Sequence, residues 1–174
     1  MSINSEYKKY EAKVKKIRGM NQIHLTEFGA WLREKGLTEK TIKNHITNVD
    51  FYINHFLVRD DALKATEGCS ELVGSFLGYH FIRKAMWASC AQIKANAASF
   101  KKFYAFMVEK GEVKQEKYNE FLAIIKEEMP EWLETMKMLE EEEAKSHEEA
   151  MAEIEAIIAN YETKNRLLKR GKRN

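Results

Sequence analysis

Apolar residues near the N-terminus recur every three or four positions, which is the spacing of one face of an α-helix. The apolar positions of the first predicted helix are Tyr7, Tyr10, Val14 and Ile17. Lysines fill the positions between them, and Gly19 is expected to end this helix. A second helix is predicted over residues 25–35, with Gly36 closing it.

The same spacing continues through the middle of the chain. Thr38 is expected to cap a helix whose buried stripe is Ile42, Ile46, Val49, Ile53 and Phe56. A shorter helix follows over residues 72–77. Ser89 and Gln92 form a capping-box pattern that opens a longer helix ending at Gly111. Its stripe is Ile93, Ala97, Phe100, Tyr104 and Met107.

Helical spacing also dominates the rest of the chain. The stripe Tyr118, Phe121, Leu122 and Ile125 predicts a helix that ends near Pro130, the expected first residue of the next helix. No segment alternates as a strand does, and the 174 residues include only one proline. The sequence therefore predicts an all-α protein, a compact helical bundle with a long C-terminal helical extension.

The C-terminal extension contains a polar stretch and then a seven-residue repeat. The stretch "EEEEAKSHEE" has almost no apolar face and is expected to run through solvent. Apolar positions between residues 147 and 168 then alternate in steps of four and three, as in coiled coils. Two interpretations stay open: an amphipathic helix that folds back on its own domain, or a coiled coil joining two chains as a homodimer, with Asn165 setting the register.

The net charge of +2 conceals a strong segregation of charge along the chain. Residues 1–20 carry a net +4 and residues 21–120 a net +2, whereas residues 121–160 carry −9 and residues 161–174 carry +5. Blocks of opposite sign suggest that different surfaces have different partners, although each run is also compatible with an ordinary solvated helix face.

The residues show no catalytic, cofactor or metal-binding motif. The five histidines are dispersed, and there is neither a glycine-rich phosphate loop nor a GxSxG elbow. Cys69 and Cys90 form no CxxC pair, which favours reduced structural thiols in a cytoplasmic protein. We therefore expect no cofactor, and the short apolar runs predict no membrane span.

Three segments in order carry a resemblance to a known family. They are "LTEFGAWLREKGLTEKTIKNHITNVDFYINHF", "ATEGCSELVGSFLGYH" and "WASCAQIKANAASFKKFYAFMVEKGEV". Within them stand F-x-x-W-L, G-L-T-x-x-T-I, a Phe-Leu helix and F-x-x-F-Y-x-F-x-x-x-x-G. Together they resemble the core-binding (SAM-like, N-terminal) domain of tyrosine recombinases, or phage integrases, over residues 21–128.

The resemblance implies a helical domain that clamps double-stranded DNA, with its second and fourth helices at the major groove. Those helices would be residues 38–57 and 89–110. The expected DNA-binding residues are Lys40, Lys43, Asn44, Thr47, Arg83, Lys84, Lys94, Ser99, Lys101 and Lys102. Lysines can neutralise phosphates and Asn can read adenine, while nearby alanines would allow close approach to a groove.

The resemblance stops where the family's catalytic domain would begin. The residues after the signature are predicted to form acidic helix, without the strands and catalytic motifs of a recombinase. We therefore expect no enzyme, but three regions: a basic helix (1–20), the core-binding-like domain (21–128) and the extension (129–174). The chain would act in DNA integration or recombination of mobile elements, with a recombinase as one conceivable partner. The alternative is a helical interaction module that dimerises through residues 147–168.

Overall fold

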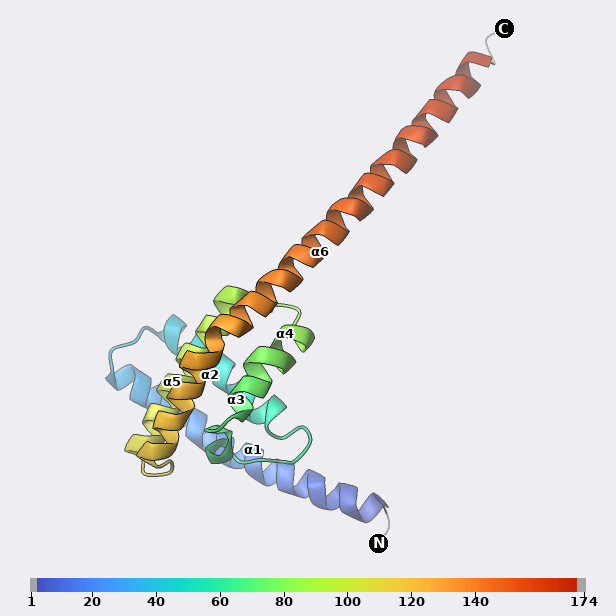
Figure 1. Cartoon of the computed structure of the whole chain (residues 1–174). Helices are drawn as coiled ribbons and strands as arrows, with labels where there is room; N and C mark the ends of the chain where they lie inside the picture. The colour runs from blue at the N-terminus through green and yellow to red at the C-terminus, as the bar shows by residue number, and fades with distance from the viewer. Residues whose placement is uncertain (1–2, 172–174) are drawn as a thin grey trace. The chain divides into compact units, whose positions relative to one another are not determined.

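The computed structural model describes residues 3–171, and side-chain surroundings for residues 5–160. Every element in the described part of the chain is helical, which confirms the all-α prediction (Figure 1). The elements are α1 (Ile3–Glu34), α2 (Glu39–Phe51), η1 (Tyr52–Phe56), η2 (Ala65–Gly68), α3 (Leu72–Ser75), η3 (Phe76–His80), α4 (Phe81–Lys84), α5 (Cys90–Glu109) and α6 (Gln115–Gly171). Of these, η1 and η3 are π-helical turns and η2 is a 3-10 turn.

The chain separates into two compact units, residues 1–136 and residues 137–174. The first unit contains α1 to α5 and the first part of α6. In the second unit, every side chain from residue 141 to residue 160 is exposed. Over the described residues, no helix combines the length and the apolar character needed to cross a membrane.

Helix α1 is longer than the sequence pattern predicts, because Gly19 does not end it. Glycine costs a helix interior only about 1 kcal/mol relative to alanine, and Gly19 lies on the exposed face. The buried stripe continues in phase across it through Asn21, Leu25 and Phe28. The Asn21 amide occupies a buried position by donating to the Ile53 carbonyl oxygen (3.1 Å) and to Asn54 Oδ1 (2.8 Å).

Helix α6 likewise continues through Pro130, where the sequence predicts that one helix ends and another begins. Trp132 and Met136 extend the buried stripe of Phe121 and Ile125, so packing keeps both sides of the proline in one helical phase. The Trp132 ring lies so close to η3 that a Cβ atom on Gly78 would come within 2.6 Å of it. Glycine at this position therefore allows α6 to pack against η3.

The caps predicted at Thr38 and Ser89 and the closing glycines Gly36 and Gly111 are confirmed, whereas the short helix predicted over residues 72–77 continues as α3, η3 and α4 to Lys84. The side-chain oxygens of Thr38 and Ser89 accept hydrogen bonds from the Thr41 and Gln92 backbone nitrogens, at 3.3 and 3.1 Å. Gly36 and Gly111 follow α1 and α5 with φ of +82° and +77°, a conformation that glycine adopts without the strain of a Cβ atom.

Aromatic rings from four elements form the centre of the first unit. Phe76 contacts Tyr52 and Phe100, with ring centroids 5.1 and 5.7 Å apart, and Tyr52 stacks on Phe100 at 4.7 Å. Phe28 of α1 meets Phe103 of α5 edge to face at 5.3 Å. All five rings are fully buried, so this cluster joins α1 and α5 to the turns η1 and η3, and η1 continues directly from α2. Helix α2 itself packs against both α1 and α5.

Two buried tyrosines connect this core to the loop that contains η2. Tyr52 and Tyr104 donate their hydroxyl protons to the Gly68 and Ala65 carbonyl oxygens, each at 2.8 Å. Burial raises the pKa of both phenols well above the ordinary value. The hydroxyls therefore stay protonated and serve as hydrogen-bond donors that hold the loop in place.

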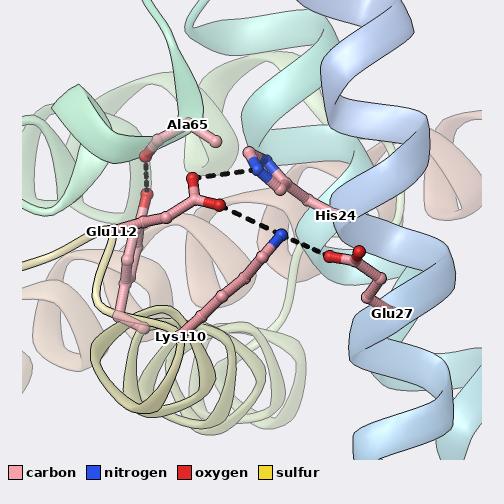
Figure 2. A network of polar contacts seen from close by, with 6 residues as sticks. His24, Glu27, Ala65, Lys110 and Glu112 are labelled. Atoms are coloured by element: carbon pink, nitrogen blue, oxygen red, sulfur yellow. Dashed lines mark hydrogen bonds and ion pairs between the residues drawn. The ribbon is translucent and has the colours of Figure 1, made fainter.

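An ion-pair network joins α1 to the C-terminal end of α5. The Glu112 carboxylate contacts His24 Nε2 at 3.1 Å and Lys110 Nζ at 3.0 Å, and Lys110 also pairs with Glu27 (Figure 2). Burial raises the pKa of Glu112, but the Lys110 hydrogen bond and the His24 charge outweigh it, so the net pKa is lowered. The network therefore stabilises the fold while Glu112 is ionised.

Glu112→Gln is expected to reduce the free energy of unfolding at pH 7 by about 0.5 to 1 kcal/mol, the range of partly exposed ion pairs. The pKa of Glu112 is lower in the folded protein than in the unfolded chain, where it is about 4.3. The extra stability of the wild type over the variant is therefore fully present above that unfolded pKa, and it is lost as the pH falls through the folded pKa. Urea unfolding at pH 7 and pH 3 measures it.

The control is Glu141→Gln, which removes an exposed carboxylate from the second unit. Its difference from wild type should be near zero at both pH values. A Glu112→Gln difference that is the same at pH 3 as at pH 7 would refute the ionic role of Glu112.

Candidate nucleic-acid interface

Helices α2 and α5 pack side by side (Figure 1). A groove lies between their outer faces. The groove has a volume of about 340 Å³. Its lining residues are mostly polar: Lys43, Asn44, Thr47, Asn48, Trp87, Gln92 and Ala95. We call this feature the α2–α5 groove. It brings together residues that are about fifty positions apart in the sequence.

The α2 side of the groove contains the predicted residues in the predicted orientation. Lys40, Lys43, Asn44 and Thr47 are all exposed, whereas Ile42 and Val49 of the same helix are buried. Positions three and four apart lie along one helix face. The four side chains therefore form a single polar row, and the last three of them line the groove.

The α5 side is only partly as predicted. Lys94 and Lys102 are exposed, as are the small residues Ala91, Ala95 and Ala98, but Lys101 is half-buried. The charge of Lys102 lowers the pKa of His45 on α2. Two exposed lysines and a row of alanines therefore make up the outer face of α5.

Ser99 is not a surface residue, contrary to the sequence prediction. Its side chain is fully buried between α5 and α2. The Ser99 hydroxyl donates to the Ala95 carbonyl oxygen at 2.8 Å and accepts from Asn48 Nδ2 at 3.0 Å. The alanine-rich surroundings of Ser99 resemble an exposed face, but α5 turns this small polar residue toward α2. Ser99 therefore connects the two helices and does not face the groove.

His45 completes the hydrogen-bond network beneath the groove. Its Nδ1 atom lies 2.8 Å from Ser99 Oγ. Because the single Ser99 proton is donated to Ala95, Nδ1 carries the hydrogen and donates it to Ser99. Burial lowers the pKa of His45, and the Lys102 charge lowers it further, so the ring is neutral at pH 7. Both lone pairs of the Ser99 oxygen are thereby used in binding α2.

Gln92 lines the groove, whereas the sequence pattern predicts that it caps α5. A capping box predicts that its side chain turns back to Ser89. The side-chain amide nitrogen instead donates to Asn48 Oδ1 at 3.0 Å and to Asn96 Oδ1 at 3.4 Å. Gln92 is thus held across the groove by α2. Its pairing with Asn48 depends on tertiary structure and leaves no local signal in the sequence.

Arg83 and Lys84 are exposed on α4, outside the set of residues that line the groove. The Arg83 guanidinium lies over the Tyr79 ring, 4.7 Å from its centroid. Both residues lie on α4, which stands between α2 and α5 along the chain. They would have to contact DNA beyond the α2–α5 groove.

A larger hollow of about 520 Å³ lies along the N-terminal half of α1, beside Val58 and Arg59. Two of its cationic side chains, Arg18 and Arg59, already have protein partners, whereas Lys15 is exposed. Arg18 donates to the Asn54 carbonyl oxygen at 3.1 Å, and Arg59 pairs with Asp60 at 3.7 Å. We take the smaller α2–α5 groove as the candidate for a polyanion, because its exposed Lys43 sits beside the side-chain amides of Asn44, Asn48 and Gln92.

Among the described residues, no three histidine, cysteine or acidic side chains are grouped so as to hold a metal ion. Comparisons of this chain with protein-family models, with curated proteins and with solved structures gave no match. The α2–α5 groove and the motifs in the sequence are therefore the basis for assigning a function.

Proposed function

We propose that residues 21–128 form a non-catalytic DNA-binding domain of the integrase core-binding type, acting in DNA integration or recombination. The observation that carries this proposal is the α2–α5 groove, in which Lys43 and side-chain amides from two helices meet on one surface. These are the two helices that the resemblance to tyrosine recombinases assigns to the major groove of DNA.

The lysines supply the attraction to the phosphate backbone. Lys40, Lys43, Lys94 and Lys102 are exposed, and their ammonium groups can each displace a counterion from a phosphate. A single exposed lysine is ordinary on a helix surface. Their grouping on two adjoining helices favours a shared role in holding a polyanion.

Asn44 and Gln92 supply groups suited to reading base edges. A side-chain amide offers one donor and one acceptor, which match N7 and N6 of adenine in the major groove. The two residues lie on opposite sides of the groove. Asn44 can make both contacts, whereas Gln92 offers only its Oε1 acceptor, because its amide nitrogen already donates to Asn48 and Asn96. The alanines of α5 leave room for the close approach that such contacts require.

The packing of the motif residues also supports the proposal. Phe28 and Leu32 of F-x-x-W-L, and Phe100 and Phe103 of the long signature, are all fully buried. The aromatic residues of the long signature on α5 therefore build the core. Of the lysines beside them, Lys102 is exposed and Lys101 is half-buried. A helical DNA clamp requires such an apolar core with cationic side chains on its surface.

Affinity for duplex DNA is expected to fall steeply with salt. If the four exposed lysines each neutralise one phosphate, the slope of log K against log salt is about −3.6. Raising the salt from 0.05 to 0.2 M then weakens binding roughly a hundredfold. Fluorescence anisotropy of a labelled duplex measures this slope.

The double variant Lys43→Glu, Lys102→Glu tests the location of the interface. It should reduce the affinity at low salt at least roughly tenfold, because two attractive contacts become repulsive. The matched control is Lys137→Glu, Lys145→Glu, which makes the same charge change at exposed lysines of the second unit. No binding by wild type at low salt, or equal losses in both variants, would contradict the proposal.

A second candidate function is self-association through the C-terminal helix. Four large apolar side chains of this helix are exposed to water, and a partner helix would bury them. They are Met151 (44% exposed), Ile154 (49%), Ile157 (68%) and Ile158 (52%). Ile154 and Ile158 fall on the seven-residue repeat. Tyr161, Asn165 and Leu168, which continue the repeat, lie outside the residues whose side chains are described. A dimeric DNA binder would be compatible with the first proposal.

Ile154→Lys is expected to dissociate such a dimer, because it places a charge in the seam of a coiled coil. Ile157→Lys is the matched control, since Ile157 is the more exposed residue and lies next to the seam, so it should weaken association less. Sedimentation equilibrium reports the mass of each. A wild-type chain that remains monomeric at high concentration would exclude the homodimer.

A further inference from the structure

The turn between α4 and α5 presents two large apolar side chains to solvent. Met86 is 99% exposed and Trp87 is 59% exposed. Large apolar side chains exposed next to each other are uncommon on a protein surface without a binding role. We therefore expect Met86 and Trp87 to contact a binding partner.

The turn is fixed at both ends, so these side chains are held outward. The Ala88 backbone nitrogen donates to the Ala85 carbonyl oxygen at 3.0 Å, and Ala85 itself is buried. Ser89 caps α5 directly afterwards. The Trp87 ring rests on Phe51 of α2, with centroids 5.6 Å apart. One side of the indole is thus supported by α2 while much of its surface remains free.

Trp87 also lines the α2–α5 groove, beside Lys43, Asn44 and Thr47. An aromatic ring among cationic and amide side chains is the arrangement by which proteins stack an unpaired base while holding its phosphates. An intact duplex offers no free base face, whereas a bulge or a kinked step does. The surroundings of Trp87 therefore favour DNA with an opened base stack.

We propose that Trp87 stacks on an unstacked nucleobase, so that the α2–α5 groove prefers duplex DNA with an unpaired or kinked position over a perfectly paired duplex. This inference rests on the proposed DNA-binding function and specifies its substrate. Met86, next to Trp87, would contact the neighbouring base or sugar. The lysines would contribute equally to both kinds of duplex.

The test compares two labelled duplexes of equal length, one fully paired and one with a single central 2-aminopurine bulge. Wild type should bind the bulged duplex more tightly and quench the 2-aminopurine fluorescence. Trp87→Ala should lose roughly fivefold to a hundredfold in affinity for the bulged duplex, and less than about twofold for the paired one. Trp87→Phe, which keeps an aromatic face, should retain most of the preference and the quenching.

Ile23→Ala is the control, because Ile23 is similarly exposed (57%) but does not line the groove. It should bind both duplexes as wild type does. Equal binding of both duplexes by wild type and Trp87→Ala overturns the stacking proposal and leaves DNA binding intact. Failure of wild type to bind either duplex at low salt overturns both. Loss of a protein partner by Trp87→Ala, with DNA binding unchanged, would instead assign the turn to protein recognition.

Discussion

The buried hydroxyl of Ser99 is the point on which the arrangement of α2 and α5 depends. The hydroxyl donates its proton to the Ala95 carbonyl oxygen within α5. Its oxygen accepts hydrogen bonds from Asn48 and His45 of α2. A polar group buried between two helices is stable only when all its hydrogen bonds are made, so this contact favours one register over others. The aromatic cluster supplies the burial energy, and Ser99 selects the position.

That register decides which side chains face solvent together. With α2 and α5 aligned by Ser99, Lys43 and Asn44 come opposite Gln92 and Ala95. Asn48 takes part in both layers, since its nitrogen donates to Ser99 and its oxygen accepts from Gln92. The groove surface is thus directly connected to the buried network, which makes it rigid, as the proposed recognition of DNA would require.

The helical stripes and their caps were predictable because they depend on neighbours three or four residues away. Phe100 and Tyr104 are buried and Thr38 and Ser89 cap helices, as local spacing indicates. Gly19 and Pro130 misled the prediction, since they are helix breakers only when the packing on their two sides is independent. Here the buried stripe crosses both of them in phase.

The site was less predictable than the fold. The exposed lysines of α2 follow from a helical wheel, but Ser99, Gln92 and Trp87 do not. A serine among alanines has no local feature that distinguishes a buried position from an exposed one. The Gln92 side chain makes a tertiary bond in place of a local cap, and the support of Trp87 by Phe51 joins residues 36 positions apart. Such pairings depend on the folded arrangement of the helices.

The most direct test of the account is an NMR titration of the isotope-labelled chain with a short DNA duplex. The groove interpretation predicts that the largest amide shifts fall together on α2 between residues 40 and 48, and on α5 between residues 91 and 102. The indole signal of Trp87 should move with them. Shifts confined to the basic N-terminal residues of α1, or an unchanged spectrum at low salt, would contradict it.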